Sequence, residues 1–321
     1  MRELPDLHED RIGQALGAWG IRPVALTHLP LGFADHHWRV TDTSGRRWFA
    51  TVADLSRKGY LGPTPVRARE RLAAAMDTAA RLHDDAGLGF VVAPLRTPEG
   101  RTVRAVGRDL VLSLFPYVEG ASGEFGRPLT PYLRGLLLDA LARLHRAAPV
   151  RGVPAAPDRI GNRAHLDAVL EDPSLVGTPG PYSGRAARLL AENTKRVRTR
   201  LEEYDRRAAR LADAPAVVTH GEPHPGNVVW RGPRPLLVDW DTVGTAPPER
   251  DLWLVASDAA DLERYSEASG HAVDPDRMDL YRLRWDLQDV AEFADAFSRP
   301  HTADRDTAQA WQAMEEVVAR L

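Results

Sequence analysis

Four polar side chains between residues 220 and 239 have the types and the spacing to act on one small chemical group. His220 and Glu222 open the stretch, Asn227 follows five residues after Glu222, and Asp239 lies twelve residues further along. Apolar runs flank a turn rich in Gly and Pro between Asn227 and Asp239, so a hairpin is expected there. Such a hairpin would bring two carboxylates and one amide to the same place.

Phosphoryl transfer is the chemistry that such a set of side chains would serve. Its transition state is loose and heavily charged, so catalysis consists mostly of positioning and charge neutralisation. A carboxylate near the acceptor hydroxyl orients it and takes its proton. Mg²⁺ prefers oxygen ligands and usually takes one or two carboxylates. Asn227 offers a neutral oxygen and Asp239 a charged one.

A turn-rich loop with a buried histidine and a surface acid is the alternative interpretation of the same stretch. It does not explain why acids stand among apolar residues, where an unpaired charge is costly. A zinc site is also disfavoured. His220 and His224 are four residues apart, but Pro223 and Pro225 flank His224, so helical metal-binding geometry is lost. We expect His220 to form structural hydrogen bonds.

The pattern along the chain changes near its middle. β-like runs at 24–29, 37–40 and 48–52 are separated by turn clusters and predict a three-stranded meander. Two further strands are predicted at 90–93 and 110–115. Helical periodicity predicts the following helices: 6–19, 64–82, 133–145, 185–211, 248–260, 276–297 and 302–321.

Two motifs then carry a family resemblance. His-Gly-Glu-x-x-x-x-Asn at 220–227, followed by Val-Asp-Trp-Asp at 238–241, resembles the aminoglycoside phosphotransferase and choline kinase family. These are small-molecule kinases with the protein-kinase fold. The resemblance implies an α+β, two-lobe fold. We expect a nucleotide-binding lobe at 1–116, with a five-stranded antiparallel sheet plus a helix, and a mainly helical catalytic and acceptor-binding lobe at 117–321.

The resemblance also implies roles for the residues of the motifs. Glu222 occupies the position of the catalytic base beside the acceptor, and His220 belongs to the same catalytic stretch. Asn227 and Asp239 occupy the metal-ligand positions, with Asp239 also facing the nucleotide. Mg²⁺ is the implied cofactor and ATP or GTP the implied phosphate donor. Two further acids are expected to be structural: Asp241 and Asp251, the latter opening the next helix.

The resemblance places the rest of the nucleotide site in the N-terminal half. Residues 31–38 correspond to the phosphate loop, in which Gly32 and Phe33 are expected to contact the nucleotide. Residues 112–117 correspond to the hinge that binds the base, with Ser113 and Phe115 as candidates.

Two features depart from the family pattern. Glu222 stands where the family usually has Asp, which moves the carboxylate outward by about 1.5 Å. The second departure is a missing lysine, because Thr51 stands near the place of the usual third-strand lysine, with Glu70 as a loosely aligned helical partner. The chain has only two lysines, Lys58 and Lys195. Lys58 either reaches into the cleft or is a solvated loop residue, and we favour the solvated loop residue.

The acceptor is expected to be an antibiotic-like molecule, an aminoglycoside or a related natural product, so that phosphorylation gives resistance or self-protection. Trp285, Asp286 and Asp289 share part of a predicted helix, where acids would bind a cationic acceptor and the indole would stack on it. The usage of Arg, Ala, Gly and Pro suggests a GC-rich genome, which suits an antibiotic producer. A metabolic kinase acting on choline, homoserine or a sugar and a nucleotide-binding pseudokinase are the alternatives.

The composition also bears on other classes of protein. The formal net charge of −3 gives no support to a nucleic-acid partner. The absence of cysteine excludes disulfides and thiolate chemistry. The sequence contains no run of 18 apolar residues, so we expect no membrane span and a cytoplasmic protein.

Overall fold

The computed structural model describes residues 9–31, 35–148, 150–157, 159–210 and 214–321. The chain forms two compact units, and they are described separately. The first comprises residues 1–156 with 215–273, and the second comprises residues 157–214 with 274–321. This division does not follow the predicted lobe boundary between residues 116 and 117, which stays a prediction.

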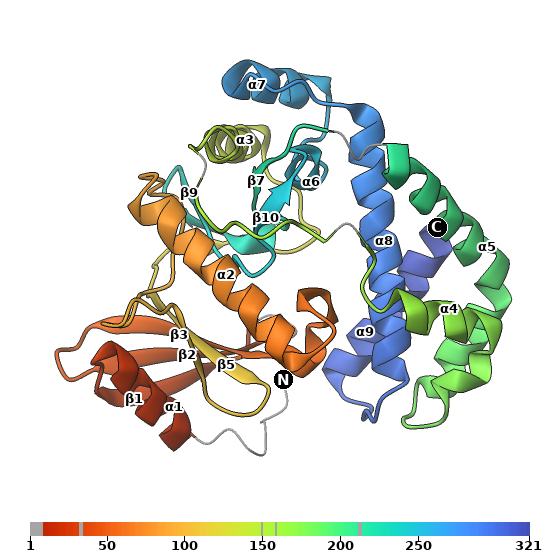
Figure 1. Ribbon diagram of the computed structural model, residues 1–321, viewed down its shortest axis with the longest axis horizontal. Coiled ribbons are helices and arrows are strands. Elements are labelled where there is room, and N and C mark those ends of the chain that lie inside the picture. Colours follow the sequence, from red (N-terminus) through yellow and green to blue (C-terminus); the bar gives the residue numbers. More distant parts are fainter. Residues whose placement is uncertain (1–8, 32–34, 149, 158, 211–213) are drawn as a thin grey trace. The chain divides into compact units, whose positions relative to one another are not determined.

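A five-stranded antiparallel sheet forms the N-terminal part of the first unit, as predicted (Figure 1). Its order is β1, β2, β3, β5, β4. The strands are β1 (Pro23–Leu29), β2 (Asp35–Asp42), β3 (Arg47–Asp54), β4 (Val103–Ala105) and β5 (Leu110–Pro116).

One predicted strand of this sheet is wrong. Residues 90–93 do not join the sheet, and Val103–Ala105 takes the fifth place. The backbone near Phe90 pairs instead with β9 (Arg234–Leu237), because Val92 N–H donates to Leu237 O at 3.0 Å and Leu237 N–H donates to Phe90 O at 2.8 Å. The apolar run therefore supports the hairpin that follows Asn227.

The two faces of the sheet differ in character. One face is apolar and packs on Ile12 and Leu16 of α1 (Glu9–Leu16), which runs into the 3₁₀ turn η1 (Gly17–Trp19). Trp38, Val40, Trp48, Ala50, Val52, Leu112 and Leu114 make up the sheet side of this core. The alternation of side chains along a strand then places His37, Thr51 and Ser113 on the opposite face, where they lie in register.

Helix α2 (Pro65–Asp84) follows two 3₁₀ turns, η2 (Leu55–Arg57) and η3 (Gly59–Leu61). Thr64 caps α2 by accepting from Arg67 N–H at 3.3 Å, and Pro65 suits the first turn. The helix predicted at 64–82 is confirmed, and it buries one apolar face: Leu72, Ala75, Ala79 and Leu82. A Cβ at Gly62 would lie 3.1 Å from Ala68 N, so glycine allows the close approach of η3 to α2.

The remainder of the first unit combines helices with short strands. A three-stranded sheet has the order β6, β8, β9, and a two-stranded sheet pairs β10 with β7. The additional elements are α3 (Pro131–His145), β6 (Ala121–Ser122), β7 (Val217–Thr219), the 3₁₀ turn η5 (Pro225–Asn227), β8 (Val228–Arg231), β10 (Gly244–Ala246), α6 (Glu249–Leu252) and α7 (Ala259–Ser269).

The helix predicted at 248–260 is divided into α6 and α7. Asp258 accepts from Asp261 N–H at 3.0 Å and caps α7, while Asp261 itself accepts from Ser257 N–H at 2.8 Å. These local hydrogen bonds start a new helix instead of continuing the first.

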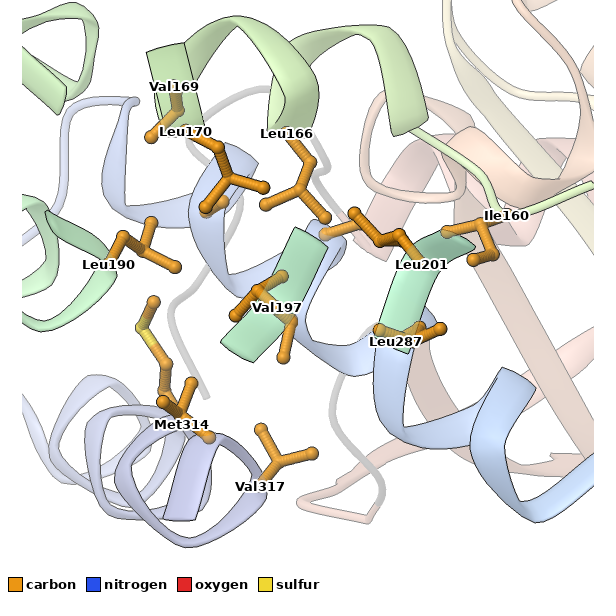
Figure 2. Close-up of a cluster of buried hydrophobic side chains, with 14 of the residues drawn as sticks. Ile160, Leu166, Val169, Leu170, Leu190, Val197, Leu201, Leu287, Met314 and Val317 are labelled. Atoms are coloured by element: carbon orange, nitrogen blue, oxygen red, sulfur yellow. The ribbon is translucent and has the colours of Figure 1, made fainter. Parts of the chain in front are cut away.

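The second unit is helical. It contains α4 (Arg163–Glu171), the 3₁₀ turn η4 (Pro173–Val176), α5 (Ser183–Arg210), α8 (Pro275–Phe297) and α9 (Arg305–Arg320). Figure 2 shows how Leu190, Val197 and Leu201 of α5 point toward side chains of the other helices. Buried Tyr204 lies on the same face of α5, and the last residue of the helix predicted at 185–211, Leu211, lies outside the described residues.

Helix α4 was not predicted. Its three buried apolar residues, Leu166, Val169 and Leu170, are too few to establish a helical period.

Within the part of the chain that the structure describes, no helix is long and apolar enough to cross a membrane. The N-terminal sheet and the largely helical C-terminal part confirm the predicted α+β fold class.

Candidate active site

The loop that follows β7 is held by one buried carboxylate. Asp251 Oδ2 accepts from His220 N–H at 2.8 Å, and Asp251 Oδ1 accepts from Gly221 N–H at 2.7 Å. Gly221 has φ = 101°, and a Cβ there would lie 2.4 Å from Nη2 of Arg250. Glycine is therefore required both by the backbone angle and by the space.

Asp251 is also tied to α3. Its Oδ2 accepts from His145 Nε2 at 3.0 Å, and both side chains are completely buried. Burial alone would raise the pKa of Asp251, but the hydrogen bond and charge of His145, with Arg250, hold that pKa below its ordinary value. The predicted structural residue thus lies in a buried network of hydrogen bonds.

His220 links this loop to the strand of Asp239. Its Nε2 donates to Val238 O at 2.8 Å, so Nδ1 is the acceptor for Glu222 N–H at 3.2 Å. The ring is fully buried beside Trp240, and desolvation lowers the pKa of His220. A neutral imidazole with these two partners fixes the positions of Glu222 and Val238.

Asn227 completes the connection between the two motifs. Its side-chain Nδ2 donates to the backbone carbonyl of Glu222 at 3.0 Å. The backbone carbonyl of Asn227 accepts from Val238 N–H at 3.0 Å. The backbone of Glu222 is thereby held at both its N–H and its C=O. Asp239 directly follows Val238, the residue whose N–H bonds to Asn227. The hairpin therefore brings Glu222, Asn227 and Asp239 close together, as their spacing predicted.

Asp239 has an unusual backbone conformation. Its φ is 63°, in the left-handed region that few residues other than glycine adopt. Desolvation by surrounding residues and the negative charge of Asp241 raise the pKa of Asp239 well above its ordinary value, with smaller contributions from Asp35 and Glu222. This excess of negative charge and the oxygen atoms of Asn227 and Asp239 fit a divalent cation such as Mg²⁺.

Lys58 lies inside this acidic group. Its Nζ is 2.6 Å from Oδ2 of Asp241 and 2.9 Å from Oδ2 of Asp35, and the side chain is 4% exposed. Tyr60 OH donates to the same Oδ2 of Asp241 at 2.6 Å. Burial alone would raise the pKa of Asp241, but the Lys58 ammonium outweighs burial and holds that pKa low.

The prediction that Lys58 is a solvated loop residue is therefore wrong. After β3, Asp54 accepts from Ser56 N–H at 3.0 Å and starts η2, and the two 3₁₀ turns fold Lys58 back among the carboxylates. The signal in the sequence was the composition, because Lys58 and Lys195 are the only lysines in an arginine-rich chain. Rarity alone does not place such a lysine, because Lys195 is equally rare and is exposed.

The residues predicted to contact the nucleotide lie on β3 and β5 or outside the described part of the chain. Thr51 Oγ1 lies 3.1 Å from Nδ1 of His37, and Ser113 is buried in register with Thr51. Phe115 pairs with Phe49 across β3 and β5. Gly32 and Phe33 lie outside the described residues. Their contacts with nucleotide stay predictions.

Two further groups of candidates lie apart from the loop of Glu222 in sequence. Glu70, the loosely aligned partner for a lysine, accepts instead from Arg67 at 2.8 Å on the exposed start of α2. Trp285, Asp286 and Asp289 lie on α8 of the second unit, where Arg320 donates to Asp286 at 2.8 Å. Their role in acceptor binding stays a prediction.

The model of the phosphotransferase enzyme family matches residues 25–281, which include β1 to β10 except the start of β1, both motifs and Lys58. This chain belongs to that family. A relative of this phosphotransferase is protein StrN of Streptomyces griseus, 31% identical over 301 residues, which cover 87% of this chain and 88% of StrN.

Solved structures share the fold of this phosphotransferase. Spectinomycin phosphotransferase APH(9)-Ia, in complex with ADP and spectinomycin, matches with a TM-score of 0.72 and 15% identity over 98% of each chain. Amicoumacin kinase hAmiN, in complex with AMP-PNP, Ca²⁺ and Ami, matches with a TM-score of 0.61 and 13% identity over 98% of this chain and 93% of its own. The kinase-like fold is therefore confirmed.

Proposed function

We propose that this phosphotransferase moves the γ-phosphate of ATP or GTP to a hydroxyl of an antibiotic-like small molecule. The observation that carries the proposal is the set of hydrogen bonds that connects Glu222 to Asn227 and Asn227 to the strand leading into Asp239. Glu222 is held through both its N–H and its C=O, and Asn227 is joined to the strand of Asp239 by a backbone hydrogen bond. Positioning of this kind is what phosphoryl transfer requires of a protein.

Asn227 and Asp239 are proposed to hold Mg²⁺, which when bound would neutralise charge on the transferred phosphate. The two residues supply one amide oxygen and one carboxylate, and the neighbouring Asp241 keeps its own charge by pairing with Lys58. The bound ADP of the spectinomycin enzyme and the AMP-PNP with Ca²⁺ of the amicoumacin kinase support a nucleotide and a divalent cation here.

Glu222 is proposed to orient the acceptor hydroxyl and to take its proton on a carboxylate oxygen as the phosphate is transferred. The His220 ring holds the Glu222 N–H, and Asp251 holds the N–H groups of His220 and Gly221. The chain of hydrogen bonds runs from the buried Asp251 to the base. The loop is thus built around a glutamate, whose longer side chain replaces the family's usual aspartate.

The acceptor class is proposed from the solved relatives, whose acceptors are spectinomycin and amicoumacin. The test is incubation with Mg²⁺ and ATP or GTP against spectinomycin, an aminoglycoside, a macrolide, choline and homoserine. Mass spectrometry should find one added phosphate on an antibiotic. Phosphorylated choline or homoserine would instead indicate a metabolic kinase, and nucleotide binding without transfer to any acceptor would indicate a pseudokinase.

Two matched variants make this test specific. Asp239→Asn keeps the shape of the side chain and removes its charge, and it should abolish the mass gain. Asp84→Asn makes the same change at an exposed position near the end of α2 and should leave transfer unchanged. Equal transfer by the wild type and Asp239→Asn would contradict the proposed site.

A further inference from the structure

The sheet face that carries Thr51 contains no lysine of its own. Thr51 Oγ1 is hydrogen-bonded to the His37 ring, and Ser113 lies beside Thr51 on β5. Burial and then the positive charge of Lys58 lower the pKa of His37 to about 4. Lys58 Nζ lies 2.9 Å from Oδ2 of Asp35, which stands two residues before His37 on β2 and therefore on the same face. The ammonium thus reaches this face although it comes from the turn after β3.

The partners of Lys58 are of two kinds. Asp241 has two donors, since Lys58 Nζ and Tyr60 OH both lie 2.6 Å from its Oδ2. Asp35 is less well satisfied, because its Oδ1 is buried without a hydrogen-bond partner among the described residues. A buried carboxylate oxygen without a partner is costly. Asp35 is thus the weaker of the two contacts.

Asp35 also belongs to a part of the sequence that is expected to contact phosphate. It opens β2 and lies within residues 31–38, the segment predicted to be the phosphate loop. Lys58 Nζ lies 2.9 Å from Oδ2 of Asp35 and 2.6 Å from Oδ2 of Asp241, which stands two residues after Asp239, the predicted metal ligand. Lys58 therefore lies between the two parts of the sequence that are expected to contact the nucleotide phosphates.

We propose that Lys58 is the phosphate-contacting lysine of this chain, and that a phosphate oxygen of the nucleoside triphosphate replaces Asp35 beside its ammonium. This inference rests on the proposed function. Asp241 and Tyr60 keep the ammonium in place during the exchange. A phosphate oxygen offers the same charge-assisted hydrogen bond as the carboxylate and would allow Asp35 to turn toward water. Lys58 thus supplies the positive charge beside the phosphate that Thr51, on β3, cannot supply.

The small number of lysines allows a direct chemical test. Acyl-phosphate derivatives of ATP and GTP deliver an acyl group to an amine that lies next to the phosphates. The lysine ammonium first loses one proton to solvent, and the lone pair of its nitrogen then attacks the acyl carbon. An amide bond forms, the bond from that carbon to the phosphate oxygen breaks, the nucleotide leaves with the electron pair of that bond, and the nitrogen loses its second proton to solvent. Lys195, exposed on α5 of the second unit, is the internal control.

Peptide mapping by mass spectrometry of the full chain should find Lys58 acylated, and excess unmodified nucleotide with Mg²⁺ should reduce this labelling by about tenfold or more. Labelling of Lys195 should not respond to nucleotide. An unlabelled Lys58, or a Lys58 labelled equally with and without nucleotide, would overturn the inference.

Two variants separate phosphate contact from a purely structural role. Lys58→Gln should weaken binding of the triphosphate by about tenfold or more and leave binding of the free nucleoside unchanged. Asp35→Asn should leave triphosphate binding as strong as in the wild type or stronger, because the competing charge is gone. Equal weakening of triphosphate and nucleoside in Lys58→Gln, or loss of triphosphate binding in Asp35→Asn, would contradict the exchange.

Calorimetry of the wild type distinguishes a failure of the proposed function from a failure of the role proposed for Lys58. A wild type that binds neither ATP nor GTP with Mg²⁺ would overturn the proposed function and this inference with it. A wild type that binds nucleotide while Lys58 resists labelling and Lys58→Gln binds normally would overturn the inference alone.

Discussion

The imidazole of His145 donates to the carboxylate of Asp251 over 3.0 Å, although 106 residues separate them in the sequence. The same carboxylate accepts from the N–H groups of His220 and Gly221. One fully buried charge therefore connects α3, α6 and the loop of Glu222. The position of the proposed base depends on an interaction that no short stretch of sequence contains.

The first prediction concerns this buried charge. Asp251→Asn should lower the free energy of unfolding by about 3 kcal/mol, because an amide replaces an acceptor to which three buried donors point. Denaturant unfolding measures the change. Asp84→Asn, at an exposed position, is the control and should change stability by less than about 0.5 kcal/mol. Equal stability of the two variants would contradict the role of Asp251.

The second prediction is how the stability difference between the wild type and Asp251→Asn depends on pH. The pKa of Asp251 is lowered in the folded state from an ordinary value of 3.8. A lowered carboxyl pKa contributes stability above the ordinary value, and this contribution is lost as the pH falls through the folded pKa. The stability difference between wild type and Asp251→Asn should therefore shrink from about pH 5 to about pH 3. A difference that grows on acidification would contradict the assignment.

The third prediction compares two glycines with positive φ. Gly221→Ala should cost about 3 kcal/mol and lower transfer activity, because the new Cβ would lie 2.4 Å from Arg250 Nη2. Gly45→Ala has a similar backbone requirement, with φ = 79°, but nothing within 4 Å of the added Cβ. It should cost only about 1 kcal/mol. Unfolding curves that coincide would show that space around Gly221 is not limiting.

The fourth prediction concerns the length and charge of the base. Glu222→Gln should reduce kcat by about 100-fold or more while nucleotide affinity is kept, since its backbone contacts do not involve the carboxylate. Glu222→Asp should also reduce kcat, because the loop holds its backbone for the longer side chain. Steady-state kinetics on the acceptor found by screening measures both. A faster Glu222→Asp enzyme would contradict this view of the loop.

Local pattern was sufficient for much of the fold. The three-stranded meander, α2, α5 and the hairpin from Asn227 to Asp239 follow from periodicity and turn residues close together in the chain. The strand at Val103–Ala105 was missed because its three residues are half-buried or exposed and have no apolar alternation. Residues 90–93 were wrongly predicted to join this sheet, because the apolar run pairs instead with β9, which lies far along the sequence.

The site was predictable in its residue types but not in its electrostatics. The spacing of Glu222, Asn227 and Asp239 predicted their meeting. The burial of Lys58 between Asp35 and Asp241 was not predicted, because it depends on two 3₁₀ turns and on partners 23 and 183 residues away. A lysine in a polar loop has no local feature that separates a buried ion pair from a solvated side chain.

The central claim is that Asp239, with Asn227, holds the metal that accompanies the nucleotide. The most direct test is calorimetric titration of wild type and Asp239→Asn with ATP or GTP, each with and without Mg²⁺. We predict that Mg²⁺ strengthens nucleotide binding to the wild type by about tenfold or more and has no such effect on Asp239→Asn. The same response to Mg²⁺ in both proteins would contradict the account.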